Sequence, residues 1–521
     1  MTNTLERVGL VILVVVVGYG LSTAFYGLGV SSFWHDELFT TFVIGTDHSW
    51  AGVFARALQD GHPPVFSLAI FAYSELFGVS EVSLRAFSAL LATASLILFV
   101  RITRDVFSLQ ARLFATGVAT ASYFWFYQSQ NARSYSLGLF VGVLILWAAI
   151  SLIRKPILEI RWFYTPWFRL TLFTFVGISI HYYMLFVALA VLAILFIFES
   201  RLRIKIMSLG IALLVVTYCY LKFVVHPNSI FLLDTSWVES NTRWYKTQTD
   251  WAIHTTVSNT KVLGAFLSII FFVSWLSKDR LNLSRIALKT GLLCMAVPIL
   301  VVVAGISSSV LMSPNYTDRN VLLASPFLWG TVAFLYDLAL GGIVKYRQAT
   351  LILTAGFVAF MLSIAPSRAM PRNTPFRESA AAINAIAGCR GKSIPVFLGD
   401  RSHITPAGIK ILGNGIYGHY LDRSIQPDPV FIEEVLSGRV KPVSTCRIVA
   451  WGAHFINSES IAHQLASRLA AVQRTPISIE EFRPPSDTLG GWKTAYLFVA
   501  NRDMQGRAAN ERSSQSVQQP R

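Results

Sequence analysis

Long apolar stretches separated by short polar segments dominate the sequence up to about residue 365. Stretches of roughly 16 to 24 residues match the hydrocarbon core of a bilayer, which is about 30 Å thick. Because lipid offers no partner for backbone N–H and C=O groups, such stretches are expected to be helices. The pattern predicts about eleven transmembrane helices, at residues 8–30, 83–101, 112–129, 135–153, 167–181, 183–199, 206–225, 261–277, 287–306, 320–338 and 348–365.

One apolar stretch is too short for this scheme. Residues 65–77 follow Pro63-Pro64 and carry Glu75, and a helix of this length is more typical of an interfacial or re-entrant segment than of a span. We therefore expect an interfacial helix here. Counting it as a span would reverse the predicted orientation of the N-terminus.

Clusters of Lys and Arg between the predicted spans indicate the topology. Each neighbouring pair of clusters is separated by room for two spans, so all the clusters can face one side, and the positive-inside rule makes that side the cytoplasm. The clusters are Arg101/Arg104/Arg112, Arg154/Lys155/Arg161/Arg169, Arg201/Arg203/Lys205, Lys278/Arg280/Arg285/Lys289 and Lys345/Arg347. The predicted N-terminus is cytoplasmic, and loops 31–82 and 226–260 lie outside with the C-terminal region. A multi-pass protein of a bacterial inner membrane fits this pattern best.

Composition agrees with a membrane protein and changes the interpretation of the net charge. Hydrophobic residues make up 54% of the 521 residues and charged residues 14%, whereas globular domains carry about 25% charged residues. The net charge of +16 lies largely in the clusters beside the spans, so we do not expect a nucleic-acid partner. Residues 501–521 are polar and are expected to be disordered.

Residues 367–500 have the pattern of a small extracytoplasmic α/β domain. Helices are predicted over 378–387 and 460–472, and strands over 394–398, 447–451, 477–482 and 495–500. Cys389 and Cys446 either form a disulfide, which an extracytoplasmic location permits, or are two separate buried thiols. We expect this domain to be a lid or an acceptor-docking module without catalytic residues.

Adjacent carboxylates follow the first predicted span, in Trp34-His35-Asp36-Glu37. Charged groups at such a position are costly unless they are solvated, paired or functional. One interpretation is a solvated helix cap in which Asp36 caps the segment 37–44. The other is a catalytic pair.

Basic and aromatic residues also lie on the predicted outer side, against the positive-inside bias. Arginine binds phosphate and carboxylate groups through forked contacts, so an anionic ligand is one explanation for them. Ion pairs with nearby carboxylates and snorkelling to lipid headgroups are the others. The residues are His62, Arg85, Arg133, Tyr135, His181, Tyr182 and Arg319.

The order of these elements resembles a known superfamily. Trp34-His35-Asp36-Glu37, His62-Pro63-Pro64, Arg85, Ala132-Arg133-Ser134-Tyr135, His181-Tyr182 and Asp318-Arg319 follow one another along the chain. This arrangement is similar to the GT-C superfamily of polyprenyl-phosphate-sugar glycosyltransferases. The branch with protein O-mannosyltransferases, lipid A aminoarabinose transferases and rhizobial lipid A galacturonosyltransferases is the most similar. The resemblance covers roughly residues 8–340, and order and placement carry it rather than any single motif.

The resemblance implies a fold, a reaction and roles for the residues. It implies a GT-C membrane domain and an inverting transfer of a sugar from a polyprenyl-phosphate donor to a hydroxyl of a lipid, glycan or protein acceptor. Asp36 would be the general base with Glu37 beside it, while His35, His62, Arg85, Arg133, Tyr135, His181, Tyr182 and Arg319 would bind substrate. The sequence departs from some branches, which have a Lys near the double proline and an acidic residue where Gln130-Asn131 stands.

Two alternatives to this transfer reaction remain open at the level of sequence. A transporter of lipid-linked sugars needs ionisable residues near the centres of spans, and the predicted span interiors are almost free of charge. A membrane polymerase or ligase of surface glycans would share the donor chemistry. No metal or other cofactor is expected.

Overall fold

The structure is a computed structural model that describes residues 2–45, 47–59, 62–154, 165–228, 238–257, 260–276, 283–312, 314–340, 347–365, 374–399, 408–409, 412–452, 456, 458–483 and 494–501. Contacts divide the chain into two compact units. The membrane unit comprises Met1–Leu28, Ser49–Ser229 and Leu233–Pro371. The α/β unit comprises Gly29–His48, Ile230–Leu232 and Arg372–Arg521. The segment Gly29–His48 therefore packs with the C-terminal residues. The predicted disordered tail beyond Asn501 lies outside the described residues.

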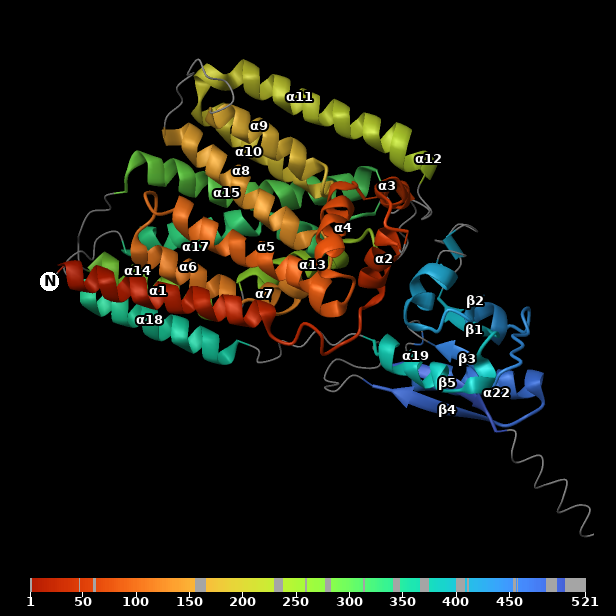
Figure 1. Cartoon of the computed structure of the whole chain (residues 1–521). Coiled ribbons are helices and arrows are strands. Elements are labelled where there is room, and N and C mark those ends of the chain that lie inside the picture. Colours follow the sequence, from red (N-terminus) through yellow and green to blue (C-terminus); the bar gives the residue numbers. More distant parts are fainter. Residues whose placement is uncertain are drawn as a thin grey trace, which may run out of the picture. The chain divides into compact units, whose positions relative to one another are not determined.

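The membrane unit is built from helices that run roughly side by side (Figure 1). A helix occupies each of the predicted spans. These helices are α1 (Thr2–Phe25), α5 (Glu81–Ile102), α6 (Leu109–Thr120) with α7 (Tyr123–Tyr127), α8 (Tyr135–Arg154), α9 (Pro166–Ile178), α10 (Tyr183–Phe198), α11 (Arg203–Tyr220), α14 (Thr260–Leu276), α15 (Arg285–Leu311), α17 (Ser325–Leu340) and α18 (Arg347–Ile364).

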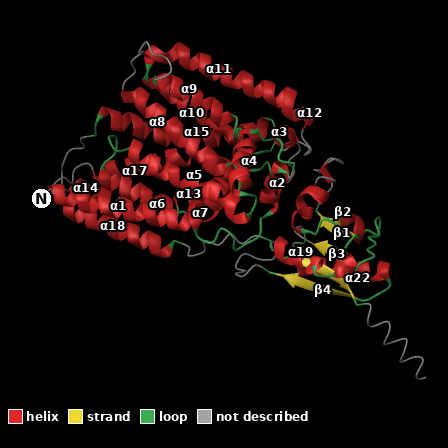
Figure 2. Cartoon of the chain, viewed as in Figure 1, coloured by secondary structure: helices red, strands yellow, loops and turns green. Residues whose placement is uncertain are grey.

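Not all of these helices are long enough to cross a membrane on their own. Among the described residues, six helices pass by length and composition, or seven if a bent helix pair counts as one span. Helices α9 and α10 belong to the shorter apolar class, and so does α4 (Val65–Phe77). The structure confirms a mostly helical protein with several apolar spans (Figure 2). Eleven spans and the interfacial position of α4 stay predictions.

Small residues let helices α15 and α17 approach closely in the membrane unit. A Cβ atom at Gly291 of α15 would overlap the ring of Phe334 in α17, and a Cβ atom at Gly330 of α17 would overlap the sulfur of Cys294 in α15. Each helix thus offers a gap that a side chain of the other fills. Such packing matters in lipid, where burial of apolar surface does not drive helices together.

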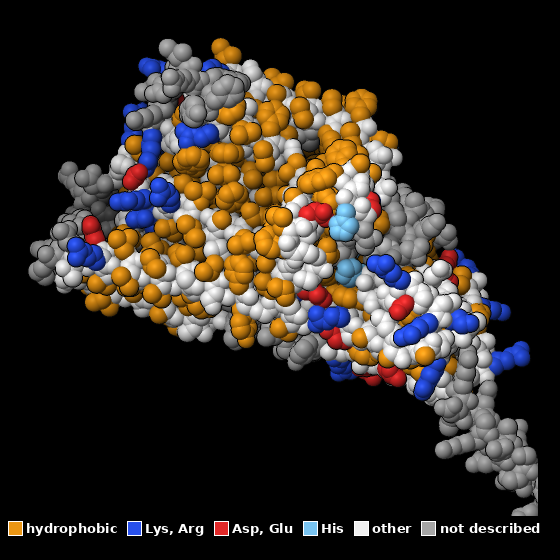
Figure 3. Space-filling model, viewed as in Figure 1, with side chains coloured by type: hydrophobic (Ala, Val, Ile, Leu, Met, Phe, Trp, Pro, Cys, Tyr) orange, Lys and Arg blue, Asp and Glu red, His pale blue; other side chains and the backbone are white. Residues whose placement is uncertain are grey.

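Basic residues gather at one end of the helices of the membrane unit. Arg154, at the end of α8, pairs with Asp105 at 3.0 Å, and Lys289, in the first turns of α15, pairs with Glu199 at 2.7 Å. Between the two ends, hydrophobic side chains cover the visible surface of the helices (Figure 3). This end corresponds to the predicted cytoplasmic clusters, although Lys155, Arg161, Lys278, Arg280 and Lys345 lie outside the described residues.

The α/β unit contains a five-stranded mixed sheet with the order β2-β1-β3-β5-β4. Strand β1 (Ser393–Leu398) is parallel to β2 (Gln426–Phe431) and β3 (Ile448–Gly452), whereas β5 (Ala495–Ala500) is antiparallel to β3 and β4 (Ile477–Phe482). The helices are α19 (Phe376–Asn384), α21 (Ile432–Leu436) and α22 (Glu459–Gln473). The strands predicted near 394–398, 447–451, 477–482 and 495–500 are thus present.

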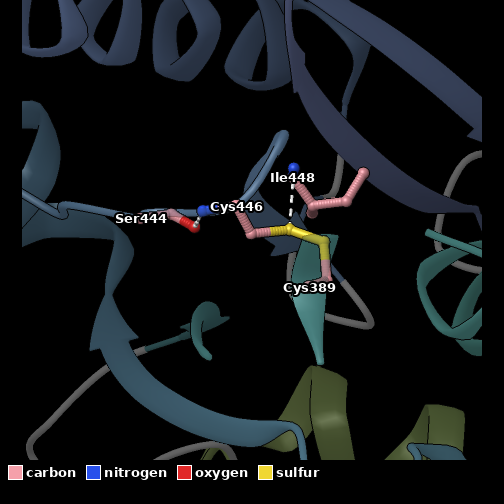
Figure 4. Close-up of a disulfide and its surroundings, with 4 residues drawn as sticks. All are labelled: Cys389, Ser444, Cys446 and Ile448. Carbon is pink, nitrogen blue, oxygen red and sulfur yellow. Dashed lines mark hydrogen bonds between the residues drawn. A yellow bond between two sulfur atoms is a disulfide. The ribbon is translucent and has the colours of Figure 1, made fainter. Parts of the chain in front are cut away.

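Cys389 and Cys446 form a disulfide, with Cα atoms 4.9 Å apart (Figure 4). Of the two alternatives left open by the sequence, the structure has the disulfide. It joins the residues before β1 to those before β3, two neighbouring strands of the sheet. Its position in the core of the α/β unit links the strand pair covalently.

Candidate functional site

The ends of several helices meet in the membrane unit at the end opposite the basic pairs. Helix α8 runs from Tyr135 to Arg154, so its first residue lies opposite the Arg154–Asp105 pair. Helix α9 ends here at Ile178 and α10 begins at Tyr183. The N–H of Val65, the first residue of α4, donates to the carbonyl of Ser179 in the intervening turn at 3.2 Å. This bond brings the His62-Pro63-Pro64 segment to the turn that carries His181.

Four of the predicted substrate-binding residues form one group, which we call the histidine cluster: His62, Arg133, Tyr135 and His181. The ring centroids of His62 and His181 are 5.6 Å apart, and those of Tyr135 and His181 are 6.3 Å apart. His181 lies in the turn between α9 and α10. Burial, followed by the nearby His62 and the positive charge of Arg133, holds the pKa of His181 well below its ordinary value. The imidazole of His181 is therefore neutral at pH 7.

The histidine cluster continues into the segment that precedes α17. The ring of His181 lies 6.1 Å from that of Tyr183, and the Tyr183 hydroxyl donates to the side-chain oxygen of Asn315 at 2.9 Å. Asn320 in turn donates to the carbonyl of Asn315 at 2.9 Å. This network holds residues 314–320, the segment that contains Arg319 in the short helix α16 (Asp318–Val321).

Helix α13 (Thr242–Val257) binds the same segment. It lies within the predicted outer loop 226–260, for which no helix was predicted. The indole N–H of Trp244 donates to the carbonyl of Tyr316 at 2.9 Å, and the side-chain oxygen of Gln248 accepts the N–H of Asp318 at 2.9 Å. Thr249 shares a hydrogen bond with the hydroxyl of Tyr316 at 2.6 Å. Trp244 and Gln248 are four residues apart, a spacing that places both on one face of a helix, and this spacing was the available signal.

Arg85 contacts a different part of the membrane unit. Its side chain is fully buried in α5 and donates to the carbonyl of Leu28 at 2.7 Å. Gln130 donates to the carbonyls of Thr23 and Tyr26 at 2.9 and 2.7 Å. Two polar side chains thus bind the carbonyls at the end of α1, where helical bonds are lacking. This is a role in positioning the chain. Phosphate binding by Arg85 stays a prediction.

The acidic pair opens helix α2 (His35–Ile44), which belongs to the α/β unit. Glu37 has an exposed fraction of 1%, and its carboxylate accepts the N–H of Trp34 at 3.2 Å. Asp36 is not the N-cap, as one interpretation of the sequence had it, because α2 begins at His35 and Trp34 precedes it; Glu37 accepts the N–H of Trp34 instead. The side chain of Asp36 is 28% exposed, and its carboxylate lies 3.8 Å from Nδ1 of His35. Of the two carboxylates, Asp36 is thus the more exposed.

The remaining predicted residues take neighbouring positions. Tyr182 precedes α10 directly beside His181, and Arg319 is half-buried in α16. Within the described residues, no group of three or more His, Cys, Asp or Glu side chains is arranged to hold a metal ion. The site residues thus fall into two sets. Asp36, Glu37 and His35 lie in the α/β unit, and the basic and aromatic residues lie in the membrane unit.

Comparisons with known proteins give a family profile and several solved structures. A profile described as dolichyl-phosphate-mannose-protein mannosyltransferase matches residues 61–223. No curated protein matches by sequence. ArnT from Cupriavidus metallidurans in the apo state is 13% identical, with a TM-score of 0.56 over 95% of this chain and 98% of that chain.

Two further structures are similar at a lower level. ArnT from Cupriavidus metallidurans bound to undecaprenyl phosphate is 16% identical, with a TM-score of 0.45 over 71% of this chain and 68% of that chain. Arabinofuranosyltransferase AftD from Mycobacteria is 13% identical, with a TM-score of 0.48, and the match covers 95% of this chain and 40% of AftD. The likeness to apo ArnT extends over nearly the whole of both chains and shows that the two proteins share a fold.

Proposed function

We propose that this chain, which has a GT-C fold, is an integral membrane glycosyltransferase that uses a polyprenyl-phosphate sugar as donor. It transfers the sugar, with inversion, to a hydroxyl of a cell-envelope acceptor at the outer face of the membrane. The likeness to apo ArnT and the family profile support the class of reaction. The acceptor is lipid A, another glycan or a protein. The chain lies in a bacterial inner membrane, with its N-terminus in the cytoplasm and the α/β unit on the periplasmic side.

The histidine cluster is the observation that carries this proposal. Arg133 and two histidines lie together at helix ends, opposite the basic pairs, where the positive-inside rule predicts few cations. A polyprenyl phosphate that inserts its tail among the helices would present its phosphate near these helix ends. Arg133 contributes a fixed positive charge to that phosphate. The imidazole rings of His62 and His181 can each donate a hydrogen bond to it.

The reaction is a direct displacement at the anomeric carbon. The acceptor oxygen forms the new bond to that carbon as the bond to the phosphate oxygen breaks, and the polyprenyl phosphate leaves with the electron pair. Asp36 takes the proton of the acceptor hydroxyl as general base, a role that contributes about 10²- to 10⁴-fold in rate. Arg133 and Arg319 stabilise the charge that returns to the phosphate. Glu37 holds the first turn of α2 through its bond to Trp34.

A transfer assay with variants of the two carboxylates tests this function. Purified protein in liposomes receives radiolabelled polyprenyl-phosphate sugars and lipid or glycan acceptors. Asp36→Asn removes the base and should reduce the rate at least about 100-fold. Glu37→Gln is the matched control, because an amide oxygen can still accept the N–H of Trp34, and it should retain most of the activity.

The outcomes separate the proposal from its competitors. Equal product from wild type and Asp36→Asn would remove Asp36 from the chemistry. Product with retained anomeric configuration would exclude a single displacement. No product with any donor, together with movement of labelled lipid across the bilayer, would identify a transporter instead.

A further inference from the structure

The acidic segment is fastened to the α/β unit before helix α2 begins. Ser32 donates its hydroxyl to the carbonyl of Thr374 at 2.7 Å and accepts the N–H of Phe376 at 3.1 Å. The guanidinium of Arg377 donates to the carbonyls of Gly29 and Val30 at 3.3 and 3.1 Å. Residues 374–377 thus bind Gly29, Val30 and Ser32 in the segment that leads to Asp36.

Tyr420 fixes the entry to α2 itself. Its hydroxyl accepts the backbone N–H of Phe33 at 2.8 Å, and its ring stacks on that of Phe33 with centroids 6.5 Å apart. The ring of His419 lies edge-on to Phe33 at 5.7 Å. Phe33 is completely buried. Because Asp36 follows Phe33 by three residues, less than one helical turn, a shift of Phe33 moves the carboxylate of Asp36 with it.

Tyr420 is held in place by a chain of bonds that reaches the sheet. Asn384, the last residue of α19, donates to the carbonyl of Tyr420 at 2.9 Å and accepts the N–H of Asp422 at 2.8 Å. Ser379, on the same helix, accepts the indole N–H of Trp451 in β3 at 3.1 Å. An unbroken path of hydrogen bonds and helical backbone therefore links the central strand β3 to Phe33.

The remainder of α2 packs against the same part of the α/β unit. A Cβ atom at Gly415 would overlap the ring of Phe42, so α2 touches the backbone of residues 412–416. The ring of Tyr417 lies 6.3 Å from that of His35 and 6.1 Å from that of Trp451. Tyr417 is completely buried. Both ends of α2 are therefore fixed by residues 412–420.

We propose that the α/β unit is the element that positions the general base, and that Tyr420 is its principal positioning residue. This inference rests on the proposed function and extends it, because the unit is then part of the reaction apparatus rather than only a lid or a docking module. Tyr420 touches no reacting atom. It acts by holding Phe33 and, through Phe33, the carboxylate of Asp36.

The effect on rate is large enough to measure. Placement of a base within reach of a hydroxyl is sensitive to shifts of about 1 Å, which can cost 10²-fold in rate. Loss of one hydroxyl leaves the ring packing intact, so a smaller shift is expected. Tyr420→Phe should therefore lower kcat about 10-fold. The KM for the polyprenyl-phosphate donor should stay within about twofold, because the residues proposed to contact its phosphate, Arg133 and Arg319, lie in the membrane unit.

The experiment compares Tyr420→Phe with Tyr496→Phe in the full-length chain. Tyr496 is in β5 of the same sheet and is also buried, so its replacement is the same chemical change away from α2. Hydrogen–deuterium exchange gives a readout independent of activity. Tyr420→Phe should speed exchange in residues 33–45 and leave β3 and β5 unchanged, whereas Tyr496→Phe should leave residues 33–45 unchanged. Asn384→Ala, which frees Tyr420 from α19, should reproduce the effect of Tyr420→Phe in weaker form.

The result separates the inference from the proposed function. A fall in kcat without faster exchange in residues 33–45 would overturn positioning by Tyr420, and so would faster exchange with unchanged kcat. Faster exchange throughout the sheet would show a general loss of structure and would also overturn it. Failure of the proposed function has another signature, namely no transfer by the wild type or full transfer by Asp36→Asn.

Discussion

The side-chain oxygen of Gln248 accepts the backbone N–H of Asp318 at 2.9 Å and so ties helix α13 to the residue before Arg319. Gln248→Ala leaves this N–H without its partner and frees α16 to shift, which displaces Arg319. If Arg319 contacts the donor phosphate and the shift breaks this contact, the KM for the donor should rise at least about tenfold, since a hydrogen bond to a charged group contributes about 1.5–3 kcal/mol. Transfer rates against donor concentration give this value. Thr247→Ala, on the exposed side of the same turn, is the control, and an equal rise in both variants would contradict the assignment.

The low pKa of His181 makes the stability of the membrane unit depend on pH. Folded His181 resists protonation, whereas in the unfolded chain it takes up a proton as the pH falls through its ordinary value of about 6.5. The stabilisation is complete above that pH and is lost below it, by up to about 1.4 kcal/mol per pH unit. Thermal unfolding in detergent from pH 7.5 to 5.5 should show a falling melting temperature that becomes shallower in His181→Gln. The same substitution at His226, an exposed histidine of the membrane unit, is the control.

Reduction of the Cys389–Cys446 disulfide should weaken the α/β unit. The two cysteines are separated by 57 positions, and the loop-entropy relation gives about 4 kcal/mol for a closed loop of this size. Cys389→Ser should therefore make the α/β unit sensitive to protease at a lower urea concentration than in the wild type. Cys219→Ser, which replaces an exposed thiol of the membrane unit, should have no effect. Identical cleavage of oxidised and reduced protein would contradict this expectation.

Cysteine labelling tests the topology on which the outer-face site depends. In a chain in which Cys219 is replaced by Ser, a cysteine is introduced at Val79 or at Arg104, which flank the two ends of α5. A membrane-impermeant maleimide should label Val79→Cys in cells with a permeable outer membrane. Arg104→Cys should be labelled only after lysis. The reverse pattern would place the histidine cluster in the cytoplasm.

The helices of the membrane unit were predictable because each rests on a local pattern. An apolar stretch whose length matches the thickness of a bilayer is helical whatever its neighbours are. Strand β2 escaped prediction because Pro427 and Pro429 lower its strand propensity. Its position at the edge of the sheet explains why two residues without an N–H are tolerated there.

The arrangement of the site depends on contacts between residues far apart in the sequence, which a local sequence pattern cannot predict. Gly29–His48 follows a predicted span, so the sequence indicates a loop of the membrane domain. The bond from Phe33 to Tyr420, 387 residues away, belongs to the tertiary structure alone. The residues of the histidine cluster could be named from the sequence, because basic residues on the predicted outer side indicate an anionic ligand. The hydrogen-bond partner of Arg85, the carbonyl of Leu28, could not be predicted from the sequence.

The close packing of α15 against α17 limits which substitutions these two helices can accept. A larger residue fits at position 291 only if Phe334 is replaced by a smaller one, and a larger residue fits at position 330 only if Cys294 is. The reason is that each glycine contacts the side chain opposite it. Among homologues, positions 291 and 334 should therefore vary in opposite directions in volume, as should positions 294 and 330. Such paired substitutions would show that the spacing of α15 and α17 is kept among homologues even where the sugar or the acceptor differs.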